Sequence, residues 1–299
     1  MARPSLMDRL LAGIIRLLQS AEAQYAEGLQ ALEGTKTGWQ DAERAVRFFK
    51  CAAHRRHLQA MVKLGECYEH GIGVEEDHIE AGLFYMNAAE GGSAEGIGRL
   101  ADCYLKGIGV DKDIPKAIRF YKEAAERNDP EGQNGLGSCY EDGAGVDKNL
   151  DEAFRWFQRS ANSGSTEGRF NLGRCYFFGI GIAVDQAQAV HWFSLAAGQG
   201  KDAFDHFDRK HPYMTIATSM GFLGYCYEMG LGVEKDARQS EHWYGEAAYR
   251  QHPDACRKYA EIIQAAMADT GNNELRERLI QRNLKFCRPR NRKKSSNGT

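Results

Sequence analysis

One pattern, repeated at a fixed spacing, constrains what this chain can fold into more than any other feature. The segment LGECY recurs as LADCY, LGSCY, LGRCY and LGYCY, and the five copies begin at Leu64, Leu100, Leu136, Leu172 and Leu223. The steps are 36, 36, 36 and 51 residues, so the last step is one period plus a 15-residue insertion. A period of this length is typical of proteins built from stacked supersecondary units.

Two further motifs follow each copy in the same order. The first is a glycine-rich turn that begins at Gly71, Gly107, Gly143, Gly179 and Gly230. An acidic or amide residue comes next, followed by a segment in which alanines flank a pair of aromatic residues. A sixth, weaker copy of this segment comes first, with Phe48 and Phe49 as its aromatic pair. Three motifs at one register identify a repeat protein.

Each unit is predicted to form two helices joined by a short turn. Ala60, Leu64 and Cys67 are spaced by three or four residues, so they share one face of the first helix. Gly71 stands where a helix end favours the left-handed conformation. Asp77 can cap the second helix, whose alanines and aromatic residues form its buried stripe. The sequence therefore predicts an all-α protein made of helix-turn-helix repeats.

This order of motifs resembles the Sel-one-like repeat family, a relative of the tetratricopeptide repeats. The resemblance covers about residues 58–253, with a weaker copy at 21–57. The chain departs from the family pattern at Ala101, Ile182 and Ser240, which replace a glycine, a valine and an alanine. The resemblance implies a right-handed α-solenoid and an adaptor or scaffold role. Family members include protein-degradation adaptors and chitin-synthase activators, so the pathway stays open.

The repeats divide the chain into parts. We expect an N-terminal amphipathic helix or cap at 1–20 and a degenerate repeat at 21–57. Five full repeats follow at 58–253, with an insertion at about 201–215. C-terminal capping helices at 254–281 and a disordered basic tail at 282–299 complete the prediction. The first part carries a leucine-rich stripe with arginines among its polar residues, and a mitochondrial presequence is the alternative reading. Since no apolar run reaches 18 residues, no transmembrane helix is expected.

The charge of the chain is unevenly distributed. The segment after Gln281 holds seven basic residues and no acid, and 32 basic against 41 acidic residues precede it, a net of −9. The tail is therefore a candidate nuclear import signal, nucleic-acid arm or contact with an acidic membrane, and a solvated tail is the plain alternative. Nucleic acid is expected as a partner only through this tail.

Five of the eight cysteines occupy one repeat position, at Cys67, Cys103, Cys139, Cys175 and Cys226. Equivalent helices of neighbouring repeats lie roughly 8–10 Å apart, whereas a disulfide needs Cα atoms within about 7 Å. No C-x-x-C pair indicates zinc either. We expect free, buried cysteines in a reducing compartment, which favours the cytoplasm, with the nucleus and mitochondria as alternatives. A redox relay along this row is the competing hypothesis.

No catalytic, metal or cofactor motif occurs, so no enzyme activity, metal or cofactor is predicted. The first helices of the last two repeats add aromatic and methionine residues outside the core stripe, at Phe170, Phe177, Phe178, Phe222, Tyr225 and Met229. Such clusters are typical of binding surfaces or of covered surface. We hypothesise that these residues and the insertion bind a partner; the alternative is that Phe204, Phe207 and Tyr213 of the insertion cover them.

The sequence thus predicts a non-catalytic adaptor or scaffold that binds protein partners or peptide segments along a concave face and assembles or regulates a complex. Two alternatives stay open. One is a nuclear or nucleic-acid-associated regulatory factor directed by the basic tail, and the other is an activator subunit of an enzyme. The oligomeric state is not predicted.

Overall fold

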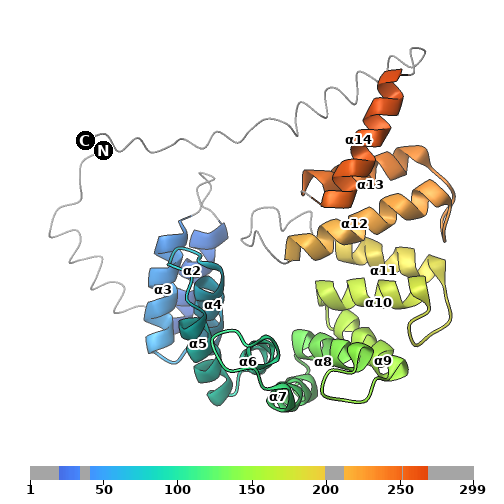
Figure 1. Cartoon of the computed structure of the whole chain (residues 1–299). Helices are drawn as coiled ribbons and strands as arrows, with labels where there is room; N and C mark the ends of the chain where they lie inside the picture. Colours follow the sequence, from blue (N-terminus) through green and yellow to red (C-terminus); the bar gives the residue numbers. More distant parts are fainter. Residues whose placement is uncertain (1–19, 34–40, 199–211, 251, 269–299) are drawn as a thin grey trace, which may run out of the picture. The chain divides into compact units, whose positions relative to one another are not determined.

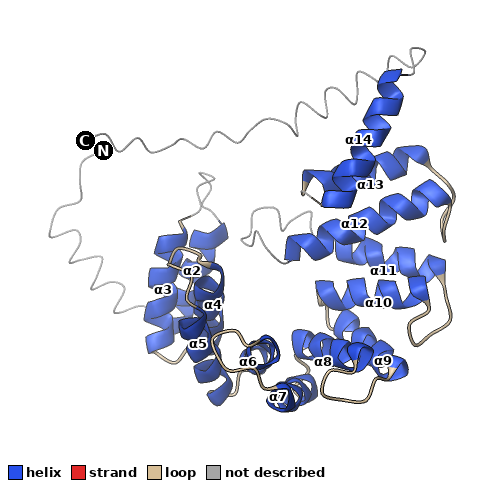
Figure 2. Cartoon of the chain, in the orientation of Figure 1, coloured by secondary structure: helices blue, strands red, loops and turns tan. Residues whose placement is uncertain are grey.

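The computed structural model describes residues 20–33, 41–198, 212–250 and 252–268 (Figure 1). Regular structure in these residues is entirely helical (Figure 2), as the repeat pattern predicts. The helices are α2 (Ala21–Glu33), α3 (Ala42–His54), α4 (Leu58–His70), α5 (His78–Glu90), α6 (Ala94–Lys106), α7 (Ile114–Glu126), α8 (Pro130–Asp142), α9 (Leu150–Asn162), α10 (Thr166–Phe178), α11 (Gln186–Gly198), α12 (Pro212–Met229), α13 (Ala237–Tyr249) and α14 (Pro253–Ala268). The predicted N-terminal helix, most of the insertion and the basic tail lie outside the described residues.

The chain forms two compact units, Met1–Ile216 and Ala217–Thr299. Unit 1 contains α2 to α11 and the first residues of α12. Unit 2 contains the rest of α12 together with α13 and α14. Within the described residues, no helix is long and apolar enough to cross a bilayer.

Unit 1 is a stack of helix pairs. Each even-numbered helix from α2 to α10 packs on the odd-numbered helix that follows it, and we call these the first and second helices of a repeat. From α4 onward, each first helix also packs on the second helix of the preceding repeat. Consecutive packing of this kind is the α-solenoid architecture, which confirms the predicted fold class.

The turn inside each repeat follows the predicted capping chemistry. Gly71 adopts the left-handed conformation with φ 66°, and its N–H donates to the carbonyl of Cys67. Asp77 caps α5 by accepting from the N–H groups of Ile79 and Glu80 at 3.0 and 3.1 Å. The second glycine of the turn, Gly73, has a further role, because a Cβ there would overlap the backbone at the start of α3. The glycine therefore lets the turn lie against the preceding repeat.

The predicted stripe forms the core. Leu64, Cys67 and Tyr85 are buried, and each junction between repeats in unit 1 has a cluster of this composition. The glycine inside the first helix lies under the second aromatic residue of the same repeat, since a Cβ on Gly65 would lie 2.5 Å from Cε1 of Tyr85. This close approach explains why glycine is kept there despite a helix-propensity cost of about 1 kcal/mol relative to alanine.

Candidate partner-binding surface

The first helices of successive repeats lie against one another in unit 1. Helix α6 contacts α4 and α8, and α8 contacts α10. Within the described residues, the second helices of successive repeats do not contact one another as closely as these first helices do. We use the name first-helix face for the polar side chains along this line of contact, which are Lys63, Glu66, Glu95, Arg99, Asp102, Glu131, Asn134, Glu141, Glu167, Asn171 and Arg174.

At the α4–α6 end, two cations hold one carboxylate. Arg99 Nη2 lies 2.6 Å from Glu66 Oε1, and Lys63 Nζ lies 2.8 Å from Glu66 Oε2. Burial alone would raise the pKa of the Glu66 carboxyl, but the charges of Arg99 and Lys63 hold it below its usual value. Glu66 is therefore ionised at neutral pH and joins α4 to α6.

At the α8–α10 end, a continuous chain of hydrogen bonds joins two repeats. Asn134 donates to Glu167 at 3.3 Å and accepts from Asn171 at 2.9 Å. Arg174 donates to Asn171 at 2.9 Å and also bonds Glu141 of α8 at 2.9 Å. These contacts fix amide and charged groups on neighbouring helices; Asn134 is buried, whereas Asn171, Arg174 and Glu141 are partly exposed.

The carboxylates of Glu131 and Glu167 lie close enough at this end for their charges to interact. Burial, and next the charge of Glu167, raise the pKa of Glu131 to about 7, although a hydrogen bond from Ser165 opposes this. Among the described residues, no lysine, arginine or histidine forms an ion pair with Glu131 or Glu167. Of the first-helix-face residues on α8 and α10, three are acidic (Glu131, Glu141 and Glu167) and one is basic (Arg174), so this end of the face carries excess negative charge.

The tyrosine of the second helix bonds an acid of the first helix in several repeats. Tyr85 donates to Glu69 at 2.7 Å, and Tyr121 donates to Asp102 at 2.6 Å. The two repeats with Phe157 and Phe193 lack this hydroxyl. In the repeat with Phe157, Glu141 stands at the position of Glu69 and bonds Arg174 instead. In the repeat with Phe193, Phe177 stands at that position, so the acid is replaced by an aromatic residue.

The predicted aromatic residues of α10 are only partly exposed. Phe170 and Phe177 are half-buried, with ring centroids 6.0 and 6.1 Å from that of Phe193. Phe178 packs edge-on against Phe177 at 4.9 Å and is 56% exposed. The structure thus brings these three phenylalanines together around Phe193, with Phe178 outermost.

The predicted residues of α12 lie in unit 2. Phe222 is half-buried, whereas Tyr225 and Met229 are 40% and 54% exposed. The alternative, in which the insertion covers the aromatic residues, concerns Phe204 and Phe207, which lie outside the described residues, and the Tyr213 side chain, which is not described either.

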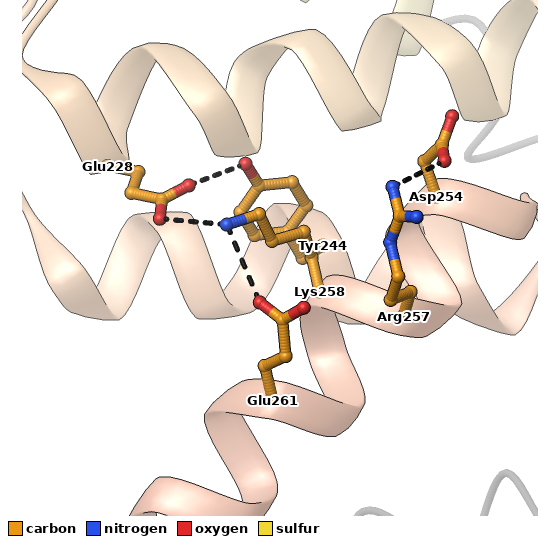
Figure 3. Close-up of polar contacts among 6 residues, drawn as sticks. All are labelled: Glu228, Tyr244, Asp254, Arg257, Lys258 and Glu261. Carbon is orange, nitrogen blue, oxygen red and sulfur yellow. Dashed lines mark hydrogen bonds and ion pairs between the residues drawn. The ribbon is translucent and has the colours of Figure 1, made fainter.

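A polar cluster joins α14 to the rest of unit 2 (Figure 3). Tyr244 donates to Glu228 at 2.8 Å, repeating the tyrosine–acid contact of unit 1. Lys258 of α14 lies 3.4 Å from Glu228 and 3.5 Å from Glu261, and the charge of Glu228 raises the pKa of Lys258. A separate pair, Arg257 with Asp254 at 2.9 Å, lies within α14. The cluster fixes α14 on the last helix pair.

The cysteine row is buried and unlinked. The seven cysteines in the described part of the chain are free, and Cys67, Cys103, Cys139, Cys175 and Cys226 are buried. Burial raises the pKa of these five thiols, to about 12 for Cys67 and about 11 for Cys139. The described residues contain no cluster of histidine, cysteine and carboxylate side chains that could hold a metal ion.

Sequence reasoning missed the contacts between repeats. The bonds of Asn134, Glu167 and Arg174 link residues 33 or 37 positions apart, at positions that vary from one repeat to the next. A signal was available only for the tyrosine–acid contact within a repeat, since Glu69 and Glu228 share a repeat position and each occurs with a tyrosine sixteen residues later. Comparing those two positions across repeats would have found the pair.

The comparisons with known proteins agree with this architecture. The Sel1 repeat model matches six segments, residues 21–57, 58–93, 94–129, 130–165, 166–201 and 217–252. A Sel1 repeat protein from Oxalobacter formigenes is 28% identical, with 77% of this chain and 87% of that chain aligned and a TM-score of 0.60.

Two further solved structures are similar. A protective antigen of uropathogenic Escherichia coli strains, described as displaying an SLR fold, is 30% identical over 89% of this chain, with a TM-score of 0.55. This chain spans 54% of that protein. An immunity protein from Pseudomonas aeruginosa, 18% identical over 77% of this chain and 81% of its own, shares the fold with a TM-score of 0.56. With six matched repeats in register with the helix pairs described above, the chain belongs to the Sel1 repeat family.

Proposed function

We propose that the chain is a non-catalytic adaptor or scaffold that binds protein segments on the first-helix face of unit 1 and thereby assembles or regulates a complex. Sel1 repeat proteins are generally interaction scaffolds, which supports the class. The observation that carries the proposal is the chain of bonds from Asn134 through Asn171 and Arg174 to Glu141. It holds polar groups in place before a partner arrives, which lowers the entropy cost of binding.

The aromatic residues supply further candidate contacts, in each unit separately. Phe178 in unit 1, and Tyr225 and Met229 in unit 2, are exposed enough to contact a partner directly. Phe170, Phe177 and Phe222 are half-buried, so their proposed role is to support the exposed side chains from below. Large aromatic side chains commonly dominate the energy of protein interfaces.

Affinity purification of the intact chain from its source cells tests this function. Two variants, Asn171→Ala/Arg174→Ala and Phe178→Ser, should each reduce the recovered partner at least about fivefold. The matched controls are Arg155→Ala and Leu195→Ser, which change exposed side chains of second helices. If all four variants recover the same partner in the same amount, the first-helix face and the aromatic residues are not the binding surface.

The basic tail offers a second candidate role. Its seven basic residues against an acidic remainder favour contact with an anionic partner such as nucleic acid, or nuclear import. Residues 282–299 lie outside the described structure, so this stays a prediction, as does cytoplasmic rather than nuclear or mitochondrial location. Deleting the tail should change localisation or salt-dependent retention on nucleic acid; unchanged behaviour in both would remove this role.

A further inference from the structure

A cavity of about 340 Å³ opens between the second helices α3 and α5 of unit 1. Its lining is mainly apolar, and Ala53 of α3, Met61 and Leu64 of α4, and Phe84 of α5 supply these surfaces. None of these residues belongs to the first-helix face. The cavity is large enough for a bulky side chain, and the proposed function places no partner on the residues that line it.

The α3 rim of the cavity is basic. Lys50 and His54 line it, and Arg47 lies three residues before Lys50 on the same side of the helix. Lys50 Nζ lies 5.3 Å from the ring centre of Tyr68. Within the described residues, no carboxylate lies at ion-pair distance from Lys50 or His54. This rim can therefore accept an external anion without breaking an ion pair.

The α5 rim is apolar where other repeats are basic or carry histidine. Leu83 is 42% exposed, and Ile79, one turn earlier, is 65% exposed. Leu83 lies one turn before Asn87, which lines the cavity. The equivalent position in the other repeats holds Arg47, Arg119, Arg155, His191 and His242. Leu83 is therefore the one apolar residue at this repeat position, and it lies beside the cavity.

Charge complementarity indicates the kind of partner. The chain before the tail has a net charge of −9, yet the exposed side of α3 carries Arg47 and Lys50 beside Arg44, which pairs with Glu27 of α2 at 3.6 Å, and Glu43 is the one acid of that helix. A basic rim beside an apolar cavity complements a ligand that is both apolar and anionic. A partner segment meets this requirement when a large apolar residue stands next to Asp or Glu.

We infer that the surface between α3 and α5 docks an acidic, amphipathic segment of a partner protein, whose bulky apolar side chain fills the cavity while a neighbouring carboxylate contacts Lys50. Leu83 and Ile79 extend the apolar contact along α5. The inference rests on the proposed scaffold function and specifies a second partner site, separate from the first-helix face.

Selection of peptides against the purified full chain tests the inference. The probe is a phage library of random peptides of roughly twelve residues, and enriched peptides are then synthesised and titrated by fluorescence anisotropy. The expected peptides carry an aromatic or long aliphatic residue beside Asp or Glu. Leu83→Arg and Lys50→Glu should each weaken their binding at least about tenfold.

The repeats supply the controls. Lys122→Glu makes the same charge change at the equivalent position of α7, so it should alter binding less than about twofold. Leu83→Arg introduces the residue found at 119 and 155, and unchanged far-ultraviolet circular dichroism would confirm that the variant folds.

Three results would overturn the inference: no enriched peptide, enriched peptides without acidic residues, or binding that survives both Leu83→Arg and Lys50→Glu. Peptides weakened by Asn171→Ala instead would bind the first-helix face, which overturns this site and leaves the scaffold function standing. If peptides bind here but affinity purification recovers no partner through the first-helix face, the proposed surface fails and this site survives.

Discussion

Arg99 of α6 reaches back one repeat to Glu66 of α4, and the guanidinium Nη2 lies 2.6 Å from the carboxylate Oε1. The side chains are 31% and 18% exposed, so the pair is shielded from water more than a surface ion pair. Removing one partner of such a pair costs more than the pair itself contributes, because the other charge is left partly buried.

Arg99→Met should therefore lower the free energy of unfolding by about 1–3 kcal/mol at neutral pH, between the values for exposed and buried pairs. The pKa of Glu66 is held below its usual value, so its contribution is present above the unfolded-state pKa and is lost as the pH falls through the folded-state pKa. Urea unfolding at neutral and acidic pH measures this, and the effect should shrink at acidic pH.

The matched control for that prediction is Arg155→Met, whose pair with Glu152 is 68% and 34% exposed. Because water screens it, this change should cost under about 1 kcal/mol. Equal losses at Arg99 and Arg155 would mean that the contact between α4 and α6 is no stronger than an exposed pair.

Glu131 has the opposite pH dependence. Its pKa in the folded chain is about 7, raised by burial and then by the charge of Glu167. A raised pKa means that stability is greatest below the unfolded-state pKa and falls as the pH rises through 7. Glu131→Gln should therefore stabilise the chain at alkaline pH by up to about 3 kcal/mol and change it little at acidic pH.

Unfolding midpoints measured across the pH range check the Glu131 prediction. Glu126→Gln, an exposed change on α7, serves as the control and should leave the midpoint unaltered at each pH. A stabilisation by Glu131→Gln that did not vary with pH would show that ionisation of Glu131 is not its cause.

Tyr121 packs against a glycine of the next repeat. A Cβ on Gly135 of α8 would overlap its ring, and Ala101 occupies the position under Tyr121 where other repeats have glycine. Gly135→Ala should lower stability by about 1–3 kcal/mol, because overpacking outweighs the gain in helix propensity. Gly221→Ala, with its nearest neighbouring atom 3.9 Å away, is the control and should be neutral or stabilising.

A double-mutant cycle extends this prediction. In the variant Ala101→Gly, the ring of Tyr121 gains room within its own repeat, so Gly135→Ala should cost less in that background than in the native chain. Thermal unfolding of the four proteins gives the coupling. Strictly additive effects would mean that Ala101 and Gly135 do not act on Tyr121 together.

These residues show where sequence reasoning succeeds and where it stops. The repeat spacing gave the helix pairs, and local chemistry gave the caps at Gly71 and Asp77, because both depend on neighbours a few positions away. The departure at Ala101 was visible in the sequence, but its counterpart Gly135 was not, since only packing brings Tyr121 to the next repeat.

The candidate site followed the same division. The sequence placed Phe178 outside the core stripe, and the structure leaves it 56% exposed. Phe170 and Phe177 looked equivalent to it in sequence, yet Phe193 in the facing second helix draws both partly inward. The polar chain from Asn134 to Glu141 could not be predicted, because it depends on pairing variable positions of different repeats.

The cysteine row makes a prediction that separates packing from redox chemistry. Burial raises the pKa of Cys67, Cys103 and Cys175 to about 12, so almost no thiolate forms near neutral pH and solvent reagents cannot reach the sulfur. Exposed Cys256 should react with iodoacetamide first, and half-buried Cys51 more slowly. Peptide-level mass spectrometry of the native chain measures the order, and labelling in denaturant shows that every site can react. Rapid native labelling of Cys67 or its equivalents would restore the redox relay as a working hypothesis, because a functional thiol must reach its partner.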